Sequence, residues 1–284
     1  MVAFRMIQTT IKVYKNLREI VTKIYHTLNL RIYETPKGRK EIIHNIDAIT
    51  LGIWKQTQGI ATKKSLYEII APMCSYKTLV VSINRCLELL KKVLNILLIS
   101  NRYSSHLVKH VDATDLPVCS LRKAKNHRTM KSIATKSKSS KGWYYGLKLH
   151  ATIDLQGRIL AVQITSANAD DREILRRMNK DLAGILVADA GYVSSKLEKE
   201  LFIENKRVLY TCMRTNMKKI ATLDDIELLK TRMRIENHFG NLKEFHNLTS
   251  TVCRSINGYL VNYLTSIISY VLKPKLDTTE YMIG

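Results

Sequence analysis

The segment GILVADAGY, residues 184–192, decides the fold class, because a short apolar run ends abruptly at Asp189 and is followed by Gly191. A short apolar run bounded by turn residues is typical of a buried strand. Downstream, a helix is expected to begin at Ser194 and to continue through Ile203, and RVLYTCM (207–213) predicts another strand. This part of the chain therefore alternates strand and helix, as α/β proteins do.

Upstream of that segment the pattern is richer in strands. HLVKHVDAT (106–114) predicts a short strand that ends near Asp112. GWYYGLKLHATID (142–154) and RILAVQITSA (158–167) predict two strands joined by a tight turn. A short helix, capped by one of two adjacent aspartates, is expected at about 170–178. Three strands in succession thus precede the alternating part.

The predicted element order is strand, strand, strand, helix, strand, helix, strand, helix. The last helix is long and is expected to run from Asp224 or Asp225 to about Phe245. This order predicts an α/β fold with a mixed sheet flanked by helices. We expect residues 1–100 to form a mostly helical N-terminal domain, 101–272 the α/β domain, and 273–284 a C-terminal tail.

The helical N-terminal region has two interpretations. Breaks at Thr35–Gly38 and at Ala71–Pro72 separate helical segments, and Ser75 is the expected N-cap of SYKTLVVSINRCLELLKK (75–92). A helix, a short turn and a second helix with exposed cations would form a helix-turn-helix that reads DNA. The alternative is a plain helical bundle. The residues that favour the first interpretation are Lys77, Asn84 and Arg85.

The composition points to an anionic partner. The 284 residues include 46 Lys and Arg against 24 Asp and Glu, a net charge of +22, which is typical of proteins that bind nucleic acid. The apolar segment 258–272 is short and interrupted by polar residues, which predicts a soluble helix and no membrane partner. The five cysteines are scattered, without CxxC spacing, which argues against disulfides and thiolate zinc sites.

The most biased segment is LRKAKNHRTMKSIATKSKSSKG, residues 121–142, which has eight cations and no acid. A solvated loop is one interpretation. The other, which we favour, is a surface that contacts nucleic-acid phosphates, because uncompensated cations repel one another unless an anion lies near. The candidate DNA-binding residues in it are Arg122, Lys123, Lys125, Arg128, Lys131, Lys136, Lys138 and Lys141.

Three acids stand out by position. Asp112 and Asp189 each end a predicted strand, where α/β sheets place their sites. Glu236 lies four residues after Arg232 and seven before Lys243, so the three share one face of a helix. That trio is either an exposed salt-bridge ladder or the wall of a site. Three carboxylates could hold two Mg²⁺ or Mn²⁺ ions for phosphodiester cleavage.

Four segments in order carry a resemblance to a known family. VDATDLPVC (111–119), GWYYGLKLHATID (142–154), LVADAGY (186–192) and RMRIENHFGNLK (232–243) resemble the core of DDE-type transposases of bacterial insertion sequences. The resemblance covers about 108–272. It implies a ribonuclease-H-like fold.

The same resemblance implies site residues. Asp112, Asp189 and Glu236 would be the catalytic, metal-binding acids, with Arg232 and Lys243 as DNA-binding residues in the signature of the last helix. Many relatives also carry a tyrosine three residues before that arginine, where this chain has a leucine.

The implied function is a transposase that cuts DNA at the terminal inverted repeats and joins the ends to target DNA. Its cofactor would be Mg²⁺ or Mn²⁺, two ions in all, and its partners double-stranded DNA and at least one further copy of the chain. A bacterial, cytoplasmic, nucleoid-associated protein is expected. Two alternatives stay open: a metal-dependent DNA nuclease on the same fold without transposition, and a catalytically inactive DNA-binding relic.

Several other polar and aromatic residues are alternative candidates for the functional site, and each also has a structural interpretation. Asp115 falls on the other face of its strand, Asp154 on a turn, and one of two adjacent aspartates on a helix cap. The remaining competitors, all expected to be structural, are His150, His238, Trp143, Tyr144, Tyr145 and Tyr192.

Overall fold

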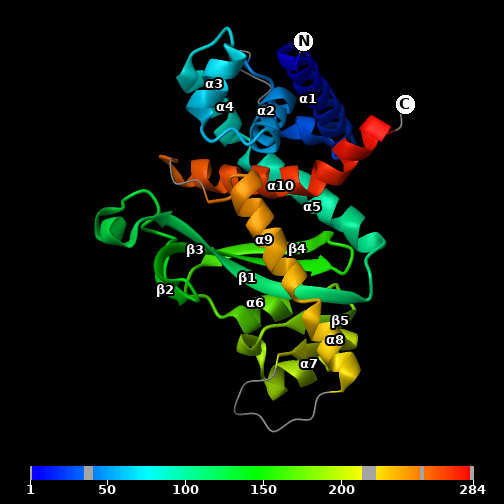
Figure 1. Ribbon diagram of the computed structural model, residues 1–284. Coiled ribbons are helices and arrows are strands. Elements are labelled where there is room, and N and C mark those ends of the chain that lie inside the picture. The colour runs from blue at the N-terminus through cyan, green and yellow to red at the C-terminus, as the bar shows by residue number, and fades with distance from the viewer. Residues whose placement is uncertain (1, 35–40, 213–221, 250–252, 282–284) are drawn as a thin grey trace. The chain divides into compact units, whose positions relative to one another are not determined.

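The computed structural model of the chain describes residues 2–34, 41–212, 222–249 and 253–281. These form two compact units (Figure 1). One comprises Met1–Leu97 together with Leu242–Gly284, and the other comprises Leu98–Asn241. The division falls inside two helices, α5 (Leu87–Tyr103) and α9 (Met233–Phe245). The tail expected at 273–284 lies partly within α10 (Ile256–Tyr281).

The first unit is helical, as the sequence predicts. Besides α10 and most of α5 it contains α1 (Val2–Thr27), the 3-10 turn η1 (Leu30–Tyr33), α2 (Asn45–Thr57), α3 (Lys63–Ile70) and α4 (Tyr76–Arg85). The predicted cap is confirmed, since the Ser75 side chain accepts a hydrogen bond from the Thr78 N–H at the start of α4.

Helix α2 is the centre of this unit, since most of its residues are buried. Its Gly52 lets α10 approach closely, because a Cβ there would lie 3.1 Å from Thr265 Cγ2. One turn further on, the buried Gln56 amide donates to Asn262 Oδ1 at 2.9 Å and to Thr265 Oγ1 at 3.1 Å. Polar groups buried with partners specify one alignment of the two helices. No helix in the described ranges is long and apolar enough to cross a membrane.

The second unit contains a six-stranded mixed sheet. The strands are β1 (Val108–Cys119), β2 (Thr135–Ser139), β3 (Gly142–Asp154), β4 (Ile159–Ser166), β5 (Gly184–Ala188) and β6 (Arg207–Thr211). The path is β2-β3-β1-β5-β6, and β4 also pairs with β3. The β1, β3 and β4 pairings are antiparallel, whereas β5 and β6 run parallel to β1. This topology is the predicted ribonuclease-H-like mixed sheet.

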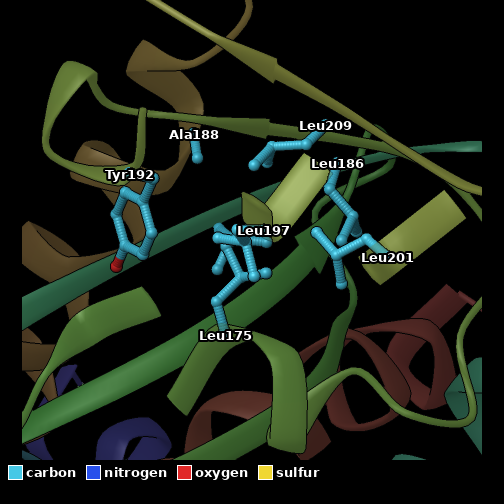
Figure 2. Close-up of a cluster of buried hydrophobic side chains, with 8 residues drawn as sticks. Leu175, Leu186, Ala188, Tyr192, Leu197, Leu201 and Leu209 are labelled. Atoms are coloured by element: carbon cyan, nitrogen blue, oxygen red, sulfur yellow. The ribbon is translucent and has the colours of Figure 1, made fainter. Parts of the chain in front are cut away.

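Helices and short 3-10 turns complete this unit: α6 (Asp171–Met178), α7 (Ser195–Asn205), α8 (Leu223–Lys230), the start of α9, η2 (Leu121–Asn126) and η3 (Ala190–Tyr192). Figure 2 shows leucines of α6 and α7 packed against side chains of β5 and β6. Val111 and Ala188 belong to the same buried cluster. One face of the sheet is therefore closed by α6 and α7.

The first strand is longer than predicted. β1 does not end near Asp112 but continues to Cys119, because β3 runs beside it from the Lys109↔Asp154 pair to the Cys119↔Tyr145 pair. The parallel pairing with β5, in contrast, extends only to His110↔Val187. Asp112 thus lies where the parallel part of the sheet ends, although its strand continues.

The predicted long helix from 224 to 245 is wrong in one respect, because it is two helices. Around Thr231 and Arg232 the backbone forms i→i+3 hydrogen bonds, such as Thr231 N–H to the Leu228 carbonyl at 3.2 Å. Thr231 Oγ1 also donates to that carbonyl at 2.6 Å. A hydroxyl that competes for the backbone acceptor, together with 3-10 bonding, interrupts the helix. Arg232 lies at this break, before α9 begins.

Candidate active site

Asp112 and Asp189 are neighbours at the place where the parallel pairing of β1 with β5 ends. β1 and β5 pair Val108 with Ile185 and His110 with Val187. Continuing that register by two residues sets Asp112 beside Asp189, on strands about 4.8 Å apart. Side chains alternate along a strand, so both aspartates point away from the face that Val111 and Ala188 share with α6 and α7.

Local backbone contacts fix the two aspartates. Asp112 Oδ1 accepts from the Ala113 N–H at 2.8 Å, and Asp189 Oδ1 accepts from the Ala190 N–H at 2.6 Å. Asp189 is exposed at the end of β5 and caps η3. Each carboxylate keeps its second oxygen free of these backbone contacts.

Glu236 is brought to the same face by the start of α9, the part of this helix that belongs to the α/β unit. Thr231 Oγ1 forms a 2.7 Å hydrogen bond with Nε2 of the buried His110 on β1. The Arg234 guanidinium donates to the Leu155 carbonyl at 2.6 Å. A Cβ on Gly157, whose φ is +83°, would come within 3.0 Å of the His238 ring, so the β3–β4 turn lies directly against α9.

Arg232 lies among the three acids. Its guanidinium is 2.8 Å from Glu236 Oε1 and 3.8 Å from Asp112 Oδ2. The Arg232 and Asp112 side chains are each 20% exposed and that of Glu236 is 50% exposed. The predicted Arg232–Glu236 proximity is therefore present across the helix break, and Asp112 joins it.

The charges of these groups affect one another. Burial raises the pKa of Asp112 to about 6; the Ala113 N–H and Arg232 lower it, whereas the charges of Asp189 and Glu236 raise it. Burial acts to lower the pKa of Arg232, but the carboxylates of Glu236, Asp189 and Asp112 raise it overall. The arrangement is a cluster of negative charge with one guanidinium as its counter-charge.

The donor set of this cluster suits a hard divalent cation, because carboxylate oxygens are the ligands that Mg²⁺ and Mn²⁺ prefer. In the part of the chain that the structure describes, no three His, Cys, Asp or Glu side chains are arranged closely enough to hold a metal ion. The Arg232 guanidinium occupies the place of a cation beside Asp112 and Glu236. The charge and donor type therefore fit a metal ion, in competition with Arg232.

The cationic segment 121–142 is folded and not a plain loop. It contains η2 and β2, and β2 pairs with β3 from Thr135↔Gly146 to Ser139↔Gly142. All eight of its cations are exposed: Arg122, Lys123, Lys125, Arg128, Lys131, Lys136, Lys138 and Lys141. Lys243 lies on α9 after Glu236, among the residues of the helical unit.

The competing acids have structural roles. Asp154 is fully buried and accepts from the N–H groups of Gln156 and Arg158, so it holds the β3–β4 turn. Asp170 caps α6 through the Arg172 N–H. Asp171 does not cap but accepts from Lys148 Nζ at 2.8 Å. Asp115 pairs across the ladder with Lys148, which places it on the face opposite Asp112.

The competing histidines and aromatic residues are also placed. His150 is buried and bonds Thr165, and Tyr144, Tyr145 and Tyr192 are buried. Trp143, in contrast, is 63% exposed. The expectation that these aromatic residues pack is thus confirmed for the tyrosines and wrong for Trp143, whose strand position points outward.

Three residues that hold α9 in place were not candidates from the sequence, namely His110, Thr231 and Arg234. The position of His110 could have marked it as a candidate, since it lies two residues before Asp112 and thus on the same face of its strand. The Arg234 contact could not be predicted from the sequence, because its acceptor is the backbone carbonyl of Leu155, 79 residues earlier in the chain.

Comparison with known proteins gives the family. The family model described as transposase DDE domain matches residues 103–256, which is more than half of the chain. No curated protein matches the chain. The crystal structure of a pre-cleavage Mos1 transpososome is similar at 11% identity over 87% of this chain and 81% of that chain, with a TM-score of 0.22, too low to support an argument. On the family match, the chain belongs to the DDE-domain transposases.

Proposed function

We propose that this protein cuts DNA at the terminal inverted repeats of a bacterial insertion sequence and joins the freed ends to target DNA. The observation that carries the proposal is the convergence of Asp112, Asp189 and Glu236 on one face of the sheet, around Arg232. Membership of the DDE transposase family supports a nucleic-acid-processing enzyme. The two open alternatives, a plain nuclease and an inactive relic, share this fold.

In this proposal Asp112, Asp189 and Glu236 would hold Mg²⁺ or Mn²⁺, two ions in all. Divalent ions ionise bound water and stabilise charge on the attacking and leaving oxygens of a phosphodiester. The remaining work falls to the chain's own groups. Arg232, released from Asp112 and Glu236, would pair with a DNA phosphate, because a guanidinium binds phosphate and carboxylate with the same geometry.

The exposed cations of 121–142 would follow the DNA backbone, each through charge pairing with a phosphate. Lys243 would add a further contact. Two element ends must be brought together for joining, so we propose that at least two copies of the chain act on the DNA, in the nucleoid of a bacterial cell.

The experiment that tests the function uses DNA that contains the sequences flanking this gene, incubated with the purified protein and Mg²⁺ or Mn²⁺. The transposase proposal expects cleavage at the ends and joined products with a second DNA. Cleavage without joined products would favour the nuclease. Binding without any cleavage would favour the relic and overturn the catalytic assignment.

Competition between Arg232 and the metal makes a separate prediction. Arg232→Gln removes a positive charge a few ångströms from two carboxylates, so we expect Mn²⁺ to bind in the absence of DNA about tenfold more tightly. Titration with Mn²⁺, followed by electron paramagnetic resonance, measures this affinity. Lys230→Gln, which removes a positive charge from an exposed residue at the end of α8, is the control. Unchanged or weaker Mn²⁺ binding by Arg232→Gln would contradict the competition.

A further inference from the structure

A basic cavity of about 810 Å³ lies within the helical unit. Its walls come from the end of α2, from α3, from α4 and from the start of α10. Five cations line it: Lys55, Lys63, Lys64, Lys77 and Arg254. This volume is in the range of cavities that hold small organic ligands. None of these residues belongs to the transposase chemistry proposed above.

Lys55 is the unusual member of this set, since it is 3% exposed. Its ammonium group has three donors, one of which is given to Gln56 Oε1 at 3.2 Å. Burial, followed by the nearby charge of Lys63, lowers the pKa of Lys55 to about 8. A buried ammonium without an opposite charge is costly. Within the described residues, no carboxylate forms an ion pair with Lys55.

Lys63, a half-buried residue whose charge acts on Lys55, repeats part of this pattern. Its ammonium donates to Asn84 Oδ1 at 2.6 Å, a neutral acceptor, and burial lowers its pKa. Across the described ranges neither Lys63, Lys77 nor Arg254 pairs with an acid. Lys64, by comparison, pairs with Glu68 at 3.3 Å. Apart from Lys64, the cations of the cavity thus have no carboxylate partner among the described residues.

The other residues that line the cavity could contact the base and sugar of a nucleotide. Val80 and Val81 of α4 form an apolar wall, and the Tyr76 ring stands at the cavity, 41% exposed. Aromatic rings stack on bases and sugars without regard to sequence. Ser255 lies directly before α10, where N–H groups favour an anion.

We propose that this cavity binds one nucleotide unit of a nucleic-acid strand, with Lys55 and Lys63 holding its phosphate. The proposal assigns a role to Asn84 that differs from the reader role expected from the sequence, because Asn84 positions Lys63. Arg85, likewise, is bonded to Glu41, to Asn45 and to the Ile43 carbonyl, so it ties helices together.

This proposal rests on the proposed function in one respect, that the protein binds DNA, and does not require that it cuts DNA. It is therefore tested without divalent metal. The full chain is titrated with a fluorescent single-stranded DNA of arbitrary sequence at several salt concentrations, because only an unpaired base can stack on Tyr76. We expect Lys55→Met and Lys63→Met each to weaken DNA binding about tenfold and to reduce the salt slope by about one. Lys77→Met, an exposed residue at the cavity, should act in the same direction and carries little risk to folding.

Lys91→Met is the charge-matched control, because Lys91 lies on α5, 52% exposed and outside the cavity. It should change DNA affinity less than about twofold. Two further arms use deoxyadenosine monophosphate and inorganic phosphate as probes. Competition with DNA by either probe at micromolar concentration would identify a free nucleotide or free phosphate as the occupant. Either result would overturn the proposal that the cavity binds a nucleotide of a nucleic-acid strand. Equal DNA affinity for the wild type and all three cavity variants would also overturn the proposal, whether or not the protein cuts DNA with metal present.

Discussion

Asp189→Asn and Glu236→Gln should each reduce DNA cleavage and joining by at least about 10³-fold, equivalent to about 4 kcal/mol of transition-state stabilisation. Each change removes one anionic ligand from the three-carboxylate set. Asparagine can still accept the Ala190 N–H bond that Asp189 makes, and Glu236 is half exposed, so neither change should disturb the fold. The measurement is the rate of cleavage and of joined-product formation on end-containing DNA with Mg²⁺.

Asp170→Asn is the matched control for this prediction. It makes the same chemical change at an exposed aspartate that caps α6, and asparagine is an equally good cap. Its activity should stay within about threefold of the wild type. If Asp189→Asn kept more than a tenth of the wild-type rate, or if Asp170→Asn lost as much, the assignment of the carboxylates would be wrong.

Gly146→Ala should destabilise the α/β unit by at least about 3 kcal/mol or prevent its folding. A Cβ at Gly146 would lie 2.1 Å from the Leu116 carbonyl oxygen and 2.9 Å from Pro117 Cα. Both obstacles are backbone atoms of the paired strand β1, next to the register shift between Pro117 and Cys119. Relief would require the two central strands to separate. The free energy of unfolding from urea titration measures the effect.

Gly240→Ala provides the opposite expectation within the same unit. Gly240 lies in α9, and a Cβ there would meet no atom within 4 Å. Alanine should therefore stabilise the protein by up to about 1 kcal/mol through helix propensity. Similar unfolding free energies for Gly146→Ala and the wild type would mean that β1 and β3 are not as closely packed as described.

The strand positions of Asp112 and Asp189 could be read from the sequence because an apolar run that stops at an acid is a local pattern. The end of β1 could not, since it depends on β3, whose pairing with β1 extends to Cys119↔Tyr145. Likewise, residues 224–245 have helical spacing throughout. The break at Thr231, where the hydroxyl bonds the Leu228 carbonyl, does not interrupt that spacing. The contact of Thr231 with His110, 121 residues earlier in the chain, has no local signal either.

The cavity of the helical unit was beyond sequence reasoning for the same reason. From the sequence, Lys55 and Lys63 look like ordinary surface cations of a basic protein. Their burial depends on the packing of α10 on α2, which nothing nearby in the sequence indicates. Gln56 reaches Asn262 and Thr265 across more than 200 residues. Burial of a charge is decided by such long-range contacts, which a single sequence does not reveal.

Binding of Mn²⁺ to the full chain without DNA tests most directly whether the three acids form one metal site. We expect the wild type to bind Mn²⁺. Asp112→Asn, Asp189→Asn and Glu236→Gln should each weaken this binding at least about tenfold, because each removes an anionic oxygen ligand. Asp170→Asn should bind as the wild type does. Equal Mn²⁺ affinity across all of these variants, or no Mn²⁺ binding by the wild type, would show that the three acids do not form one metal site.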